Sequence, residues 1–137
     1  MPTWKVRDKR AVLIAAMQEL AGSAHISFEG DLTSTKISGL TGVSGNETAV
    51  LKRNTLWPPQ DFVVLPLEAD LVETITAAIG GTVPRSILHI QIEKDGHLEL
   101  GLYDNFDPKT SFFGSRLTSE FFDRLASRGI VKQWTNG

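Results

Sequence analysis

The sequence lacks cysteine entirely, which excludes disulfide bonds, thiolate metal sites and a cysteine nucleophile. Long apolar runs are missing as well: the most prominent one, residues 11–17, is followed directly by Gln18 and Glu19. A run of this length is too short to cross a membrane and fits the apolar side of a helix, so we expect neither an export signal nor a membrane partner. Together with the missing cysteine, this favours a cytoplasmic protein.

A surplus of positive charge is also absent. The 14 lysine and arginine residues are outnumbered by 16 aspartate and glutamate residues, which gives a net charge of −2. Such a chain has no uniform positive field to attract a phosphate backbone, so we do not expect nucleic acid as a partner. The 137 residues, with 41% hydrophobic and 22% charged side chains, are typical of one soluble globular domain, which we expect to span 1–137.

Three helices are predicted from apolar residues spaced three and four apart. They are expected over residues 7–21, 66–79 and 118–128. Asp8 and Thr118 have side chains suited to capping the first and third helix, and Pro66 suits the first turn of the second. A glycine follows each helix and favours its end there.

Strands are predicted where apolar and polar residues alternate. They are expected over residues 25–32, 49–56, 62–65, 88–94, 97–103 and 130–134. Trp57-Pro58-Pro59 interrupts the second and third, since proline cannot continue a ladder. Residues 33–48, rich in glycine, serine and threonine, are predicted as a flexible connection.

The order of these elements is α-β-β-β-α-β-β-α-β, and no internal repeat is evident. Helices and strands do not alternate strictly, as they do in parallel sheets. The sequence therefore predicts an α+β domain with a mainly antiparallel sheet of about five or six strands and about three helices packed on one face.

The hairpin around Gly96 is expected to have a three-residue loop, residues 94–96. A two-residue turn would place Glu93 opposite Leu98 and so mix polar with apolar side chains on one face. The three-residue loop instead pairs Glu93 with His97 and keeps the two faces distinct.

The sheet face turned away from the helices is predicted to be polar and open to solvent. The candidate binding residues on this face and just beyond it are Glu29, Asp31, His89, Gln91, Glu93, Glu99, Tyr103, Asp104 and Asn105. Their acidic excess suits a basic protein partner. A solvated face without any partner fits the same pattern, so the sequence leaves both interpretations open.

Histidine beside a carboxylate is the usual pairing for acid–base chemistry near neutral pH, and the candidates are His25, His97 and Glu93. His25 can join such a site only if its strand lies beside one of the others. In the predicted register His89 lies four strand residues from Glu93, about 13 Å. His89 and His97 then cannot ligate one metal ion, and we expect neither a metal nor a cofactor.

Three further motifs point to chemistry less specifically. Residues 103–108 lack the spacing of a calcium loop and are predicted as a turn with Phe106 in the core. The three glycines of residues 39–45 lack the strand–loop–helix context of a phosphate-binding loop. The basic residues among 4–10 fit contact with an acidic partner or nucleic acid, or a solvated helix start.

Two classes of function remain. The preferred one is a non-enzymatic protein-binding domain presenting the acidic, histidine-containing sheet face; by size and charge, a small bacterial toxin-neutralising (immunity-type) protein is of this kind. The alternative is a small enzyme that uses a histidine–carboxylate pair for acid–base chemistry. The sequence leaves the oligomeric state open.

Overall fold

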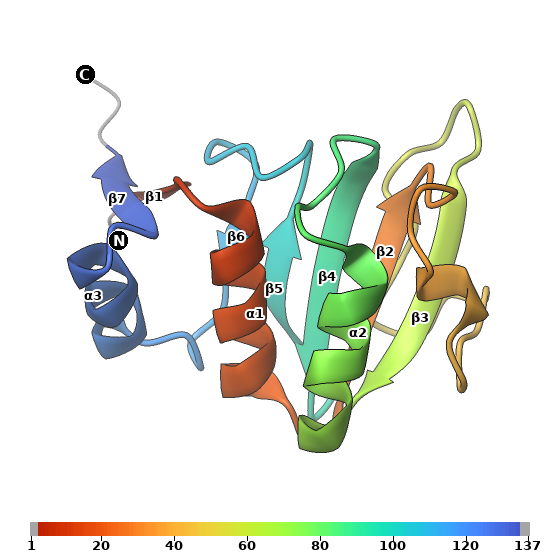
Figure 1. Cartoon of the computed structure of the whole chain (residues 1–137), viewed down its shortest axis with the longest axis horizontal. Coiled ribbons are helices and arrows are strands. Elements are labelled where there is room, and N and C mark those ends of the chain that lie inside the picture. Colours follow the sequence, from red (N-terminus) through yellow and green to blue (C-terminus); the bar gives the residue numbers. More distant parts are fainter. Residues whose placement is uncertain (1–2, 135–137) are drawn as a thin grey trace.

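The computed structural model describes residues 3–134 and has an α+β fold, as the sequence predicts. A five-stranded antiparallel sheet has the order β3-β2-β4-β5-β6, and a separate two-stranded ribbon pairs β1 with β7 (Figure 1). The strands are β1 (Thr3–Val6), β2 (Ala24–Gly30), β3 (Asp61–Leu67), β4 (Ile87–Lys94), β5 (His97–Leu102), β6 (Phe112–Phe113) and β7 (Val131–Trp134). The helices are α1 (Lys9–Leu20), α2 (Val72–Ile79) and α3 (Ser119–Ser127), with short 3-10 turns at Ile37–Gly39 and Ala69–Leu71.

Helices α1 and α2 lie side by side on one face of the sheet, whereas α3 lies beyond the β6 edge, next to the ribbon (Figure 1). The side chains between these helices and the sheet form the main core, which includes Leu13, Met17, Ile26, Phe28, Ile75, Ile90, Ile92 and Leu100. Burying each side chain of this size contributes about 1.5–3 kcal/mol. The apolar half of each alternating strand therefore holds the helices against the sheet.

The predicted helix caps are confirmed. Asp8 accepts a hydrogen bond from the backbone N–H of Ala11, and Thr118 accepts one from Phe121. The second helix is shorter than predicted, because Pro66 belongs to β3 and not to a helical first turn. Strand β3 lies at the edge of the sheet, where proline is tolerated because its missing N–H is not needed for pairing with a further strand.

The strand predicted over residues 49–56 does not form. That segment is irregular, while β1 and β6 form where no strand was predicted. Strand β1 exists only through its pairing with β7 at the far end of the chain, and β6 has two residues, too few to show alternation.

The predicted register of the β4–β5 hairpin is wrong. Asp95 and Gly96, with φ of 52° and 82°, form a two-residue turn that pairs Lys94 with His97. A β-bulge then shifts the register, so that Glu93 faces Leu98 while Ile92 faces Leu100. The extra residue of the bulge reconciles the two-residue turn with the apolar face, a combination that strict alternation excludes.

A short repeat lies at the centre of the sheet, contrary to the expectation of none. Residues 25–31 read His-Ile-Ser-Phe-Glu-Gly-Asp, and residues 89–95 read His-Ile-Gln-Ile-Glu-Lys-Asp. The two segments pair with each other antiparallel, with Ser27 opposite Gln91 at the midpoint. Each belongs to a helix–strand–strand unit, α1-β2-β3 or α2-β4-β5, so the order and pairing of the four strands β3-β2-β4-β5 have an approximate two-fold symmetry that β6 does not share.

Candidate functional site

The second face of the sheet is covered by the long connection between β2 and β3. We call residues 44–60 of this connection the strap. It is bonded to the edge strand through Ser44, which pairs with Val64. Farther along, Leu51 is fully buried in a small second core with Phe62 and Val64, against which Leu98 packs.

Two buried polar side chains of the sheet, Glu29 and Gln91, hold the strap by its backbone. The Glu29 carboxylate accepts hydrogen bonds from the N–H groups of Asn54 (2.7 Å) and Thr55 (3.0 Å). The Gln91 amide donates to the carbonyl oxygen of Lys52 at 2.7 Å. Hydrogen bonds to a charged acceptor contribute roughly 1.5–3 kcal/mol, so Glu29 is the strongest of these attachments.

His89 connects the strap to the turn after β5. Its Nδ1 accepts a hydrogen bond from the Asp104 N–H at 3.2 Å, and its Nε2 lies 2.9 Å from the Thr55 hydroxyl oxygen. Because Nδ1 is the acceptor, the ring proton resides on Nε2 and is donated to Thr55. Thr55 thus contacts both Glu29 and His89, which lie opposite each other on β2 and β4.

The tip of the strap, residues 56–59, projects beyond these attachments. Leu56 and Trp57 are 92% and 82% exposed. Behind them, Arg53 donates to the carbonyl oxygen of Gln60 at 2.8 Å and stacks on the Phe62 ring. The tip is therefore a pair of large apolar side chains on a loop that is braced at both ends.

The expectation of an open polar face is wrong for its central residues. Ser27, Glu29, His89, Gln91, Glu93 and Glu99 are all buried, with at most 8% exposure. The reason is tertiary: the strap and the chain after β5 supply hydrogen-bonding partners to groups that would otherwise need water. A surface for a partner cannot be made from these six side chains in this conformation.

The remaining candidate residues lie at the margin of that face. Asp31 and Asp104 are exposed, and Tyr103 and Asn105 are half-buried. Hydrogen bonds from the Thr33 hydroxyl and backbone N–H lower the pKa of Asp31. Asn105 donates to the carbonyl oxygen of Ile87 at 2.9 Å and accepts from Lys9, so its side chain serves the internal packing.

Residues 104–106 make a tight left-handed turn, and the prediction that Phe106 enters the core is confirmed. All three residues of the turn have φ between 51° and 67°. Phe106 is 5% exposed.

A histidine–carboxylate pair does form, between His25 and Glu93. Strand β2 lies beside β4, and His25 Nδ1 is 2.6 Å from Glu93 Oε1, while Glu93 Oε2 accepts from the Gly96 N–H. His97 is opposite Lys94 and takes no part in the pair. The contact occupies Nδ1 of a half-exposed ring and leaves Nε2 for a second partner, an arrangement suited to proton transfer.

Glu99, another acid expected on this face, pairs with Arg116. Its carboxylate lies 3.3 Å from Arg116 Nε and accepts from the Arg116 N–H. This contact closes the turn between β6 and α3 over the sheet edge, so Glu99 has a structural partner.

Four surface grooves of about 280 to 470 Å³ are formed by the described residues. None of these four is lined by His25, His97 or Glu93. Within residues 3–134, no three histidine, aspartate or glutamate side chains are placed to hold a metal ion. No helix of the described part is long and apolar enough to span a membrane.

Comparisons with known protein families, curated proteins and solved structures yield no match. The assignment of a site therefore depends on the geometry alone. Leu56 and Trp57 are the candidates that the sequence interpretation missed. The available signal was a leucine–tryptophan pair followed by two prolines in a polar segment, which cannot be buried in a strand.

Proposed function

We propose that the chain is a non-enzymatic protein-binding domain that anchors itself in a partner through Leu56 and Trp57. The observation that carries this proposal is the exposure of both side chains, 92% and 82%, next to a backbone fixed by buried hydrogen bonds. Tryptophan is enriched among the residues that dominate interface energies. A loop already held in place loses little conformational entropy on binding.

The approximate two-fold symmetry of the sheet supports a dedicated role for the strap. The β4–β5 strands are joined by Asp95 and Gly96 alone, whereas the equivalent β2–β3 strands are joined by residues 31–60. The fold therefore needs only a tight turn at this position. Long connections in compact domains are usually functional, and this one carries an exposed apolar tip.

We expect a partner with an apolar pocket for the strap tip and with basic groups on its rim that meet the aspartates nearby. Asp31, Asp61 and Asp104 are exposed at the end of the sheet from which the strap tip projects, while the strap itself carries the exposed cations Lys52 and Arg53. Complementary charge at an interface rim accelerates association and excludes wrong partners. The basic protein partner inferred from composition is thus retained, with a different contact surface.

In its most specific form, the proposal is a bacterial cytoplasmic protein that neutralises a toxin. Small size and acidic balance support it. A toxin gene next to the gene of this protein supports this form, and a neighbourhood without one contradicts it.

The binding role is tested by capture with a substitution at the tip. Proteins retained by the immobilised native chain are identified, purified and titrated calorimetrically against the native chain and against Trp57→Ser. We expect about thirtyfold weaker binding for Trp57→Ser, since hot-spot truncations cost about 2 kcal/mol or more. Phe112→Ser is the matched control. It alters an exposed aromatic residue of β6, away from the strap, and should bind the partner as tightly as the native chain. A partner that binds Trp57→Ser as tightly as the native chain contradicts the role of the tip.

Acid–base catalysis by His25 is the alternative function, and the 2.6 Å contact with Glu93 favours it. None of the four surface grooves is lined by His25 or Glu93, so none of them would hold a substrate against the pair. Turnover that is lost in His25→Gln and kept in His97→Gln would replace the binding proposal with an enzymatic one.

A further inference from the structure

Positive charge is concentrated at the two ends of the chain. Of the 14 lysine and arginine residues, 7 lie in segments 3–10 and 124–134, together with a single acid, Asp8. The remaining 7 share the rest of the sequence with 15 acidic residues. A chain of net charge −2 thus has two strongly basic segments far apart in sequence.

The fold brings these two segments together in the β1–β7 ribbon. Lys5 is directly opposite Lys132, and the Arg7 N–H donates to the carbonyl oxygen of Ile130. Arg128 follows the last residue of α3, two residues before Ile130. We call Lys5, Arg7, Arg128 and Lys132 the ribbon patch; all four are exposed.

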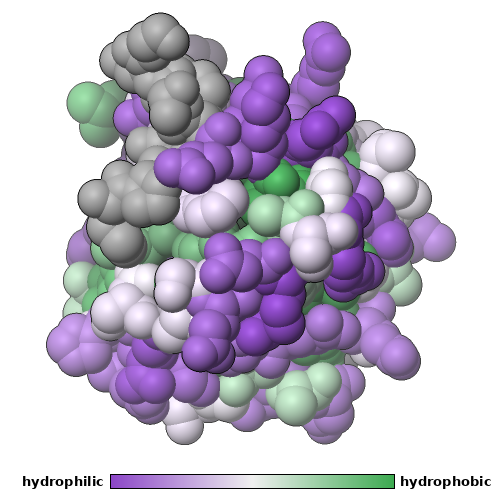
Figure 2. Space-filling model, turned by 90° about the vertical axis from the view of Figure 1, so that its left-hand side faces the viewer, coloured by the Kyte–Doolittle hydropathy of each residue, from purple (hydrophilic) through white to green (hydrophobic). Residues whose placement is uncertain are grey.

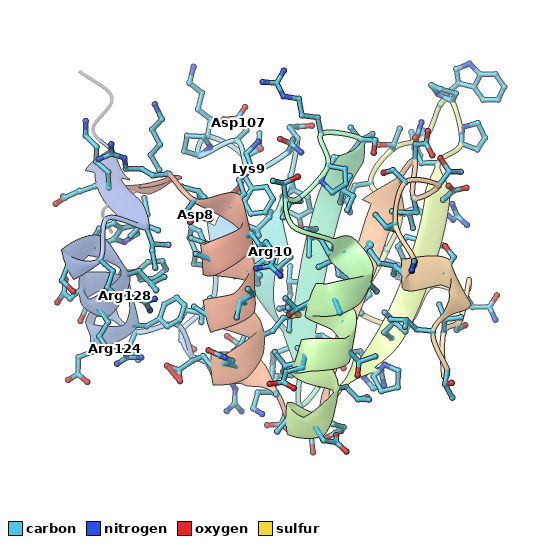
Figure 3. All side chains as sticks on the ribbon, in the orientation of Figure 1. Asp8, Lys9, Arg10, Asp107, Arg124 and Arg128 are labelled. Atoms are coloured by element: carbon cyan, nitrogen blue, oxygen red, sulfur yellow. The ribbon has the colours of Figure 1, made fainter. Side chains whose placement is uncertain are left out.

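The other three basic residues of these segments have partners within the chain. Lys9 bonds to Asn105, Arg10 donates to the carbonyl oxygen of Gly80, and Arg124 pairs with Glu19. Figure 3 shows Arg10 reaching from α1 toward α2, whereas Arg128 lies at the C-terminal end of α3, near the ribbon. Among the ion pairs of residues 3–134, none involves a member of the ribbon patch.

The pairing of Lys5 with Lys132 is unfavourable for the free protein. Like charges directly opposite each other on an antiparallel pair destabilise it, and Arg7 and Arg128 add to the local repulsion. An acidic residue at either position would relieve this repulsion. An anionic partner would relieve it too.

We propose that the ribbon patch binds an aspartate- and glutamate-rich peptide segment of a partner protein. Strands of four residues span about 13 Å, which suits a short extended peptide better than a nucleic-acid duplex. The acidic excess elsewhere on the chain repels a long polyanion or an anionic membrane. Figure 2 looks onto this side, where hydrophilic residues predominate around a hollow floored by apolar ones.

The ribbon lies beyond the β6 edge of the sheet, whereas the tip of the strap lies on the β3 side, so we expect the two sites to act independently (Figure 1). Trp57→Ser should therefore leave peptide binding unchanged. A negative result for peptide binding at the ribbon patch therefore does not contradict the proposed binding through Leu56 and Trp57, and the reverse also holds.

The test uses a short fluorescein-labelled oligoglutamate peptide, the full chain and fluorescence anisotropy at low salt. Lys132→Glu should weaken peptide binding about tenfold, while Lys132→Arg retains it. Lys36→Glu makes the same charge change on an exposed lysine between β2 and β3, far from the ribbon, and should bind within about twofold of the native chain.

Thermal unfolding gives the second readout. Lys132→Glu should raise the Tm above that of the native chain, because it turns a repelling cross-strand pair into an attracting one. A variant that is more stable yet binds the peptide less tightly supports a binding role for the patch. The proposal is overturned by absent peptide binding, by equal weakening in Lys36→Glu, or by preference for oligothymidylate or anionic vesicles of matched charge.

Discussion

At the scale of single residues, the Tyr103 ring fills the space that a side chain at Gly101 would occupy. A Cβ on Gly101 would lie 2.5 Å from Cε2 of Tyr103, so the ring occupies the space above the glycine. The ring also lies near His89, with centroids 5.8 Å apart. Burial in this position raises the pKa of the Tyr103 phenol above its ordinary value of 10.0.

Because Tyr103 is the only tyrosine of the chain, its ionisation can be followed by tyrosinate absorbance alone. We expect the titration midpoint of the folded protein to lie above that of the chain in denaturant, which should be about 10. The fold favours the neutral phenol, so this contribution to the free energy of unfolding is complete below pH 10 and declines as the pH rises further. Tyr103→Phe should remove that decline. Identical midpoints in the two states would show that the ring is not buried.

At the scale of elements, the strap depends on a carboxylate inside the sheet. The two carboxylate oxygens of Glu29 each accept a hydrogen bond from one of two successive backbone N–H groups. A glutamine has only one side-chain oxygen, and its NH2 group cannot accept. Glu29→Gln leaves one buried donor without an acceptor, at a cost of about 1–3 kcal/mol. The change should be local, because the apolar core beneath the helices is untouched.

Hydrogen exchange measures this effect directly. The amides of Asn54 and Thr55 should exchange much faster in Glu29→Gln than in the native chain, while those of β4 change little. Glu68→Gln alters an exposed glutamate at the end of β3 and should leave both amides protected. Unchanged protection of Asn54 in Glu29→Gln would mean that the strap is held by other contacts.

The strap also shows where prediction from sequence fails. Apolar residues in the polar segment 49–56 suggested a strand, and Leu51 is indeed buried. In this segment, however, the N–H groups of Asn54 and Thr55 donate to Glu29, and the Lys52 carbonyl accepts from Gln91, instead of pairing with a neighbouring strand. Such side-chain partners lie 25 or more residues away and leave no local periodicity.

At the scale of the whole molecule, the two ends of the chain are joined by an aromatic contact. The ring of Trp4 stacks on Phe122 with centroids 5.2 Å apart, and Phe122 meets Phe113 edge-on at 5.0 Å. The cluster links the ribbon to α3 and to the last strand of the sheet. It explains how β1, which is only four residues long, stays in place.

Trp4→Ala should therefore cost about 2–3 kcal/mol of unfolding free energy, less than the roughly 3–5 kcal/mol of a fully buried aromatic, because Trp4 is only half-buried. Trp57→Ala makes the same chemical change at a site 82% exposed and should stay within about 0.5 kcal/mol. Denaturant titration of both variants measures the difference. An equal loss in the two would mean that the strap tip supports the fold, which contradicts its role as a free binding surface.

The sequence by itself determined the features that depend on near neighbours. Helix caps at Asp8 and Thr118, the alternation of β2, β4 and β5, and the burial of Phe106 follow from residues a few positions apart. The α+β class follows from their order. The candidate residues at the sheet margin, Asp31 and Asp104, were placed correctly at the surface for the same reason.

Tertiary structure alone decided which segments meet. It covered the second sheet face with the strap, inserted the bulge that sets the β4–β5 register, and joined His25 to Glu93 and Lys5 to Lys132. It also left Leu56 and Trp57 in solvent, although both are apolar. Periodicity reports which side of an element is apolar, but the neighbour that covers that side is chosen by packing and hydrogen bonding across the whole chain.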